Sequence, residues 1–278
     1  MSYEDYEGSI ASARPVRLYL FERGNTGGSA IYWAYTNADR DMVLDGYNYR
    51  QIAIDDDGIR QTGEPTNDML KVTMPSTSDI ANMFKATQPS DEIWLTIREV
   101  DFNEPQSALI VWVGSIAQVA YPREDTAEVN CASLEASLQR NLLKRTYNRN
   151  CDYAIYSADC GLNKAHYAIA ATVVAMDGQA ITCSMASPPT RSLNYGIVEW
   201  PSMNGLATET RGIDYVDGNG RIILIGGTGG LKIGQSVTLY PGCDQSSATC
   251  NNVFNNMLNY GGFRHLPGKS PFDGDPIM

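Results

Sequence analysis

NCDYAIYSADCG at residues 150–161 and GCDQSSATCN at residues 242–251 are the two stretches that decide how this chain folds. Each stretch carries two cysteines around a short polar loop, and we call them together the four loop cysteines: Cys151 and Cys160, then Cys243 and Cys250. The residues between the two stretches show the turn signals and short apolar runs of β-structure. Two cysteine loops that an intervening fold brings together are one way to build a four-thiolate site.

The spacing within the two loops, Cys-x8-Cys and Cys-x6-Cys, bears on which metal such a site would hold. Structural zinc sites commonly use two cysteines only two to four residues apart, because both thiolates bind one small ion. An iron–sulfur cluster is larger and accepts thiolates from wider loops. The spacing therefore favours a cluster over zinc. Two disulfides formed after release from the cell, or four unrelated free thiols, remain open as alternatives at this point.

The composition restricts the class of protein. The 278 residues include 21 Lys and Arg against 32 Asp and Glu, which gives a formal net charge of −11. Such acidity argues against sequence-specific binding of nucleic acid and against an anionic membrane surface. No apolar run approaches the length of a membrane span, so we expect no stable membrane insertion. The polar start lacks the pattern of a signal peptide, and we therefore expect synthesis in a cytoplasm, where cysteines more often bind metal than form disulfides.

The N-terminal half reads as a small β-barrel over residues 16–132, preceded by an N-terminal arm at residues 1–15. The Asp45-Gly46 turn between apolar flanks predicts a β-hairpin. We interpret Asp55 to Gly58 as an acidic turn, because the EF-hand spacing of calcium ligands is missing. The expected strands are residues 17–22, 30–35, 43–49, 70–74, 92–100, 108–120 and 126–131.

The spacing of the apolar residues changes from a strand pattern to a helix pattern between the two halves. Leu134, Leu138 and Leu142 lie at i, i+4 and i+8 and predict an amphipathic helix in a linking segment, residues 133–150. Residues 151–240 read as a second small barrel. Residues 241–278 form an irregular tail that we expect to pack over the cysteine loops. The fold class is thus mainly β, with two barrel domains joined by a helix, and Cys131 and Cys183 are expected to be buried thiols that bind no metal.

No catalytic pattern is visible. The two histidines, His166 and His265, lie in no known catalytic motif, although either could line the cysteine site. The glycine run from Gly226 to Gly230 follows a strand, but no helix pattern follows it, so it is a turn and not a phosphate cradle. We expect no enzyme activity.

A family resemblance adds to this interpretation. The order and separation of the four loop cysteines resemble the iron–sulfur-binding C-terminal domain of lambda-like minor tail protein L. The ending from Cys250-Asn251-Asn252-Val253-Phe254 through Tyr260-Gly261-Gly262-Phe263 to Pro267-Gly268 is similar to the ending of BR0599-type phage and gene-transfer-agent tail proteins. The first 150 residues look like the N-terminal domain that is fused to it in those proteins.

The resemblance implies a structural hub protein in the tail tip or baseplate of a virion. It implies a homotrimer that forms an upper hub ring between the sixfold distal tail protein and a threefold central hub or tail fibre protein, around the tape measure protein. It also implies a 4Fe-4S iron–sulfur cluster whose ligands carry over onto the four cysteines Cys151, Cys160, Cys243 and Cys250.

Two other functions remain open. An iron–sulfur redox protein would need a partner cofactor site, yet the sequence has no flavin or nicotinamide fingerprint. A tail component whose loops are cross-linked by zinc or disulfides could bind cell-wall carbohydrate through Tyr32, Trp33 and Tyr35, although aromatic-rich strands usually belong to a core.

Overall fold

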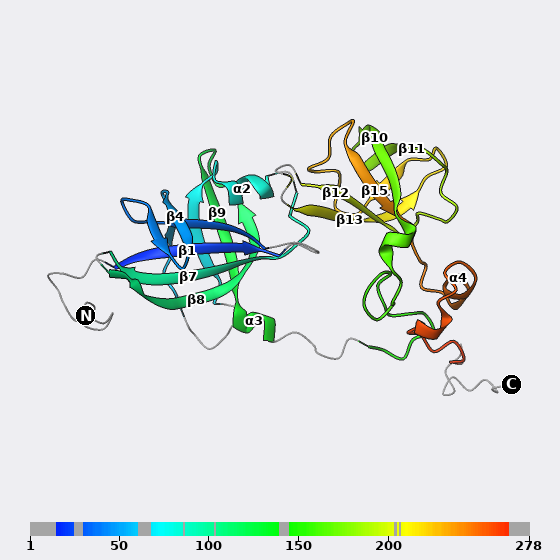
Figure 1. The fold of residues 1–278 in the computed structure, drawn as a ribbon, viewed down its shortest axis with the longest axis horizontal. Helices are drawn as coiled ribbons and strands as arrows, with labels where there is room; N and C mark the ends of the chain where they lie inside the picture. The colour runs from blue at the N-terminus through cyan, green and yellow to red at the C-terminus, as the bar shows by residue number, and fades with distance from the viewer. Residues whose placement is uncertain are drawn as a thin grey trace. The chain divides into compact units, whose positions relative to one another are not determined.

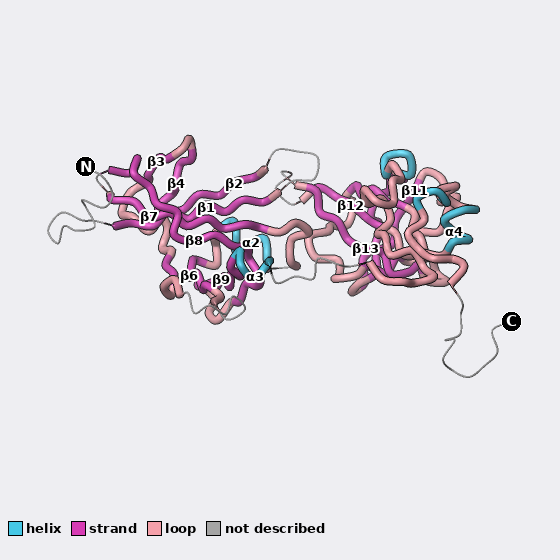
Figure 2. The backbone as a smooth tube through the Cα atoms, turned by 90° about the horizontal axis from the view of Figure 1, so that it is seen from below, coloured by secondary structure: helices cyan, strands magenta, loops and turns pink. Residues whose placement is uncertain are grey.

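The structure of the chain, a computed structural model, is mainly β and forms two compact units (Figure 1). The first unit takes in residues 1–141 and 204–208, and the second takes in residues 142–203 and 209–278. Strands run through both units, and the helices are short (Figure 2). None of the helices in the described part of the chain has the length and apolar character that crossing a membrane requires. The described residues are 15–24, 30–60, 68–85, 87–102, 104–138, 145–202, 205 and 207–266.

The first unit is built on one sheet with the strand order β3-β4-β2-β1-β7-β8-β9-β6-β5. β2 and β4 pair in parallel, whereas all other neighbouring strands of this sheet are antiparallel. The elements are β1 (Pro15–Arg23), β2 (Ile31–Thr36), β3 (Met42–Leu44), β4 (Tyr47–Gln51), β5 (Asp55–Asp56), β6 (Leu70–Pro75), α2 (Asp79–Phe84), β7 (Ile93–Asp101), β8 (Glu104–Ala120), β9 (Thr126–Ser133) and α3 (Leu134–Leu138).

The mainly β prediction is confirmed, and the first unit differs from the expected barrel in one respect. Its nine strands form a sheet, and in the residues described here its two end strands, β3 and β5, are not neighbours. The predicted hairpin is present: Leu44 pairs with Tyr47, and the turn residues Asp45 and Gly46 both have positive φ. This is the backbone that a two-residue hairpin turn requires.

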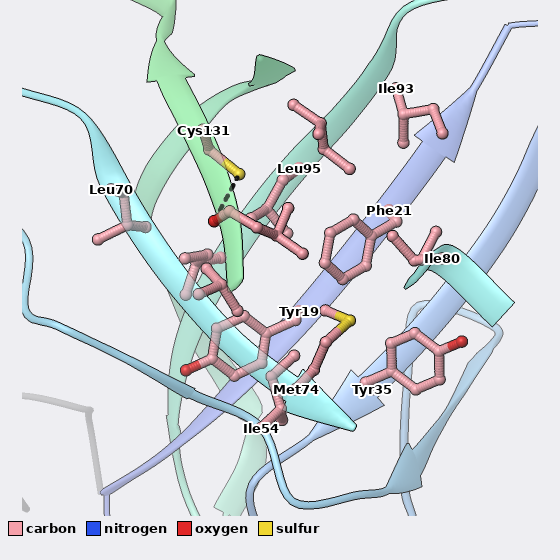
Figure 3. Packing of buried hydrophobic residues seen from close by; sticks show 14 of the residues in the cluster. Tyr19, Phe21, Tyr35, Ile54, Leu70, Met74, Ile80, Ile93, Leu95 and Cys131 are labelled. Carbon is pink, nitrogen blue, oxygen red and sulfur yellow. Dashed lines mark hydrogen bonds between the residues drawn. The ribbon is translucent and has the colours of Figure 1, made fainter. Parts of the chain in front are cut away.

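β1 is buried on both faces over Leu18 to Phe21. Tyr19 and Phe21 point into the larger core, which Figure 3 shows. Leu18 and Leu20 point the other way, into a second core under the β3–β4 hairpin. The sheet therefore separates two apolar cores, and β1 contributes side chains to both. Cys131 lies fully buried in the larger core, where burial raises the pKa of its thiol, so its expected burial is confirmed.

Within the described residues, the linking segment is helical only over α3. α3 spans Leu134–Leu138, and residues 139–144 lie outside the described part, as do residues 1–14 of the N-terminal arm and residues 267–278 of the tail. Both leucines at the ends of α3 are exposed, Leu134 by 46% and Leu138 by 78%.

The second unit is a closed barrel of six strands, in the order β10-β11-β14-β13-β12-β15. Trp200 is 1% exposed in its core. Cys183 packs against that core but is only half-buried, whereas the sequence predicts a buried thiol. The elements are η1 (Lys164–Tyr167), β10 (Ile169–Asp177), β11 (Ala180–Met185), β12 (Ile197–Pro201), β13 (Thr208–Val216), β14 (Ile222–Leu224), β15 (Ser236–Tyr240), α4 (Ser247–Asn252) and η2 (Met257–Asn259).

Candidate metal centre

The register of the barrel explains why the two cysteine loops meet. β10 is its first strand and β15 its last, and they pair antiparallel to close it, with Ile169 opposite Leu239. The chain therefore enters and leaves the barrel at the same end. The first cysteine loop precedes β10 and the second follows β15, so both lie at that end. Figure 1 shows the green segment before β10 beside the orange segment that carries α4.

The four loop cysteines line one pocket, which has a volume of about 20 Å³. All four are free thiols; Cys250 is buried, and the other three are half-buried. Within the described ranges, no three His, Cys, Asp or Glu side chains are grouped closely enough to hold a metal ion. The remaining lining residues are Tyr153, Ile155, Leu162, Gln245, Phe254, Asn256 and Asn259.

Backbone hydrogen bonds join the first loop to the second loop and to the tail. The amide of Cys151 donates to the carbonyl of Gln245 at 2.9 Å. The amide of Gly261 donates to Sγ of Cys151 at 3.3 Å, and the amide of Gln245 donates to Sγ of Cys243 at 3.4 Å. N–H groups aimed at sulfur stabilise thiolates and tune clusters that thiolates hold. Two of the four sulfurs therefore already have such a donor.

The spacing of the second loop follows from a helix cap. Ser246 is the N-cap of α4, and its hydroxyl accepts a hydrogen bond from the amide of Thr249 at 3.1 Å. The carboxylate of Asp244 accepts from the amide of Ser246 at 3.0 Å and fixes the turn before the helix. As a result, Cys243 lies in the turn and Cys250 in the helix, and both line the pocket.

Asn256 is also in contact with both loops. Its Nδ2 lies 2.7 Å from the carbonyl oxygen of Cys160 and 3.8 Å from the sulfur of that residue. Its main-chain carbonyl oxygen accepts from the thiol of Cys250 at 3.3 Å, so the contact to the second loop is made through the backbone of Asn256.

The electrostatics of the pocket favour protonated thiols when no cation is present. Burial and the neighbouring thiols of Cys243, Cys151 and Cys160 raise the pKa of Cys250 to about 11. Burial also raises the pKa of Cys243, although the amide of Gln245 opposes that rise. A cation that replaces the protons removes this penalty, because metal ligands must be deprotonated. We therefore expect Cys243 and Cys250 to lose their protons when a cation binds.

An aromatic cluster ties the cysteine loops to the barrel. The ring of Tyr156, in the first loop, lies 6.0 Å from that of Tyr240 at the end of β15 and 5.9 Å from that of Tyr167. The ring of Tyr167 lies 5.5 Å from that of Phe254, just after α4. The guanidinium of Arg191 lies over Tyr167 at 5.0 Å. These contacts hold both loops against the same end of the barrel.

Three of the five non-glycine residues with positive φ in the described part of the chain lie near the pocket. Tyr156, Gln245 and Asn255 all have positive φ, at 64°, 62° and 49°. Such conformations cost energy for residues other than glycine and commonly occur at functional sites. Gly261 has a different constraint, because a Cβ there would collide with the ring of Tyr153.

The structure brings together every cysteine that the sequence singles out for the site. The tail also packs over the pocket as expected: Asn256 and Asn259 line it, and the amide of Gly261 donates to Sγ of Cys151. His166 and His265 are exposed and do not line the pocket. Sequence reasoning missed Gln245 and Asn256. Their only signal is position, since each follows a loop cysteine within a few residues.

Comparisons with known proteins cover both units. Residues 19–163, just over half of the chain, match the family described as "Baseplate hub protein, N-terminal attachment domain". Residues 191–270 match the family described as "Phage conserved hypothetical protein BR0599". The first match includes Cys151 and Cys160, and the second includes Cys243 and Cys250.

Two similar proteins extend these matches. An uncharacterized protein of Xylella fastidiosa (strain 9a5c) is 26% identical over 194 residues, which are 64% of this chain and 38% of that protein, so the chain spans well under half of that relative. A chain in the solved structure of the virion of a native gene transfer agent particle has a TM-score of 0.79 and 19% identity, over 100% of this chain and 96% of that one. That likeness shows a common fold. From the match over residues 19–163, we conclude that this chain belongs to the family of baseplate hub proteins and is a structural component of the virion tail.

Proposed function

We propose that this chain forms the upper hub ring of a tail tip or baseplate and that the four loop cysteines hold a structural iron–sulfur cluster in it. The ring would contain three copies of the chain. It would adapt the sixfold distal tail protein to a threefold central hub or fibre protein, around the tape measure protein. Membership of the baseplate hub family supports the location, and the two β units in each chain would give three copies the six modules that a sixfold partner requires.

One observation supports the cluster most strongly: the four loop cysteines line one pocket at the point where the chain enters and leaves the barrel. The residues present suit such a group, because the donors are four thiols and amide groups already point at two of the sulfurs.

When bound, the cluster would supply four metal–thiolate bonds, and its binding free energy would add to the folding free energy. The chain's own residues already position the ligands: the cap at Ser246 sets the second loop, and the amide of Cys151 ties the first loop to it. We therefore assign the site a structural role, as a fastener that joins the two ends of the barrel to the tail.

Anaerobic purification followed by visible absorption and counts of iron and acid-labile sulfide tests the cluster. We expect broad absorption near 400 nm, on the order of four iron and four sulfide per chain if the cluster is 4Fe-4S. Stoichiometric zinc without sulfide, or two disulfides in freshly purified protein, would overturn it. Electron microscopy of particles labelled on this chain tests the ring: label at the tail tip, with threefold symmetry, is the expected result.

A further inference from the structure

Asn256 has contacts that join the two cysteine loops directly. Its side-chain amide donates to the carbonyl of Cys160 at 2.7 Å and lies 3.8 Å from the sulfur of Cys160. Its own amide donates to the carbonyl of Cys250 at 2.9 Å, and its carbonyl accepts from the thiol of Cys250 at 3.3 Å. One residue of the tail therefore holds a cysteine of the first loop and a cysteine of the second.

The local backbone explains how Asn256 reaches the pocket. The chain leaves α4 and reverses at Asn255, which has a φ of 49°. The side-chain oxygen of Asn256 then accepts from Nδ2 of Asn259 at 2.8 Å, which fixes the orientation of its amide group. With its oxygen engaged in this way, Asn256 can present only its NH₂ group to Cys160. Both asparagines line the pocket.

We propose that Asn256 is a positioning residue for the cluster: it sets the separation of Cys160 and Cys250 across the pocket and directs an N–H at the thiolate of Cys160. The proposal rests on the cluster of the proposed function. An amide donor beside a ligating sulfur stabilises its negative charge and raises the reduction potential of the cluster. Aspartate has the same shape as asparagine, but at this position it would remove the donor and add a negative charge beside four thiolates.

The chain offers a matched control for this test. Asn252, the last residue of α4, is exposed, and its side-chain oxygen accepts from Nδ2 of Asn251 at 3.0 Å. Asn252→Asp introduces the same charge into the same segment and keeps that acceptor. Asn256→Ala separates the loss of the donor from the added charge. All three variants are compared with the wild-type chain, each purified anaerobically.

Three measurements decide the role: the iron and sulfide content, the rate at which a chelator removes the iron, and the midpoint potential of the cluster that remains. For Asn256→Asp we expect iron loss to accelerate about tenfold or more, the range typical of lost outer-shell partners, and the potential to become more negative. Asn256→Ala should show a smaller shift in the same direction. Asn252→Asp should behave as the wild type.

The outcomes separate this inference from the proposed function. A wild-type chain without iron and sulfide overturns the cluster and the role of Asn256 with it. A loaded wild-type chain, together with Asn256→Asp and Asn256→Ala variants that lose iron at the wild-type rate and keep its potential, overturns only the role of Asn256. A variant that loses iron faster but keeps the wild-type potential refutes the N–H contact to the thiolate, and the residue then serves only to space the loops.

Discussion

Ile169 in β10 and Leu239 in β15 lie directly opposite each other in the strand pair that closes the barrel. This register places the start and the end of the barrel at one point, and the four loop cysteines meet there. The site is thus a consequence of the barrel topology, while the barrel core itself contains none of these cysteines. Variants at the loop cysteines should therefore affect the site and leave the barrel folded.

Cys243→Ser is expected to yield colourless protein and particles that are tailless or not infectious. Serine keeps the shape of the side chain but does not replace a thiolate as a ligand, so the cluster loses one of four bonds. Visible absorption, iron counts and infectivity assays provide the measurements. Cys183→Ser, at a half-buried thiol in β11, is the control and should keep the colour. Normal particle assembly from Cys243→Ser would show that the site is dispensable.

The sequence predicted those elements that form through interactions between residues close together in the chain. The Asp45-Gly46 turn forms because both residues tolerate positive φ. α2 also has a local cause, because the hydroxyl of Ser78 caps it and accepts from the amide of Ala81 at 3.3 Å. The candidate site was predictable for a related reason, since cysteine pairs around a β unit are rare enough to be noticed by spacing alone.

Features whose cause is distant in sequence were missed. Asp55 to Gly58 reads as a plain acidic turn, yet Asp55 and Asp56 form β5, and Asp56 binds Arg17 and Tyr19 on β1. Buried and exposed side chains do not alternate regularly along β13. Its sequence therefore lacks the alternation of apolar and polar residues by which a strand is predicted. Asn256 was missed because its partners depend on how the tail folds back. No local pattern encodes these contacts.

Gly261→Ala is expected to destabilise the chain by about 1–3 kcal/mol, the usual cost of overpacking. A Cβ at this position would collide with the ring of Tyr153, and moving the backbone away would lengthen the N–H contact to the sulfur of Cys151. Chemical denaturation measures the change, together with faster iron loss. Gly218→Ala is the control, since a Cβ there meets nothing within 4 Å and its φ is not positive. Equal stability of the two variants would contradict the predicted crowding.

Asp56→Asn should lower the stability of the first unit by about 2 kcal/mol, a typical value for hydrogen bonds to a charged group. Burial alone would raise the pKa of Asp56, but hydrogen bonds from Arg17 and Tyr19 outweigh it and hold that pKa below the ordinary 3.8. The carboxylate therefore stabilises the fold above pH 3.8, and its contribution fades as the pH falls through the lower folded-state value.

Urea unfolding at neutral pH and near pH 3 measures this contribution from Asp56. The wild type should exceed Asp56→Asn at neutral pH, and the difference should shrink in acid. Asp45→Asn serves as the control, because the side chain of Asp45 is 60% exposed in its pair with Arg98, so its loss should cost about 0–1 kcal/mol. A difference between wild type and Asp56→Asn that stays constant with pH would refute the role of the charge.

Removing the cluster with a chelator and an oxidant should destabilise the second unit and spare the first. The four loop cysteines, the aromatic cluster around Tyr156 and the contacts of Asn256 all lie in the second unit. The first unit has its own buried cores, which contain none of the ligands. Calorimetry before and after chelation should therefore show the transition of the second unit at a lower temperature and that of the first unchanged. Limited proteolysis should cut first in residues 241–266, because the tail loses its attachment to Cys151 and Cys160. Equal losses of stability in both units would show that the metal acts on the whole chain and would contradict a fastener confined to one end of the barrel.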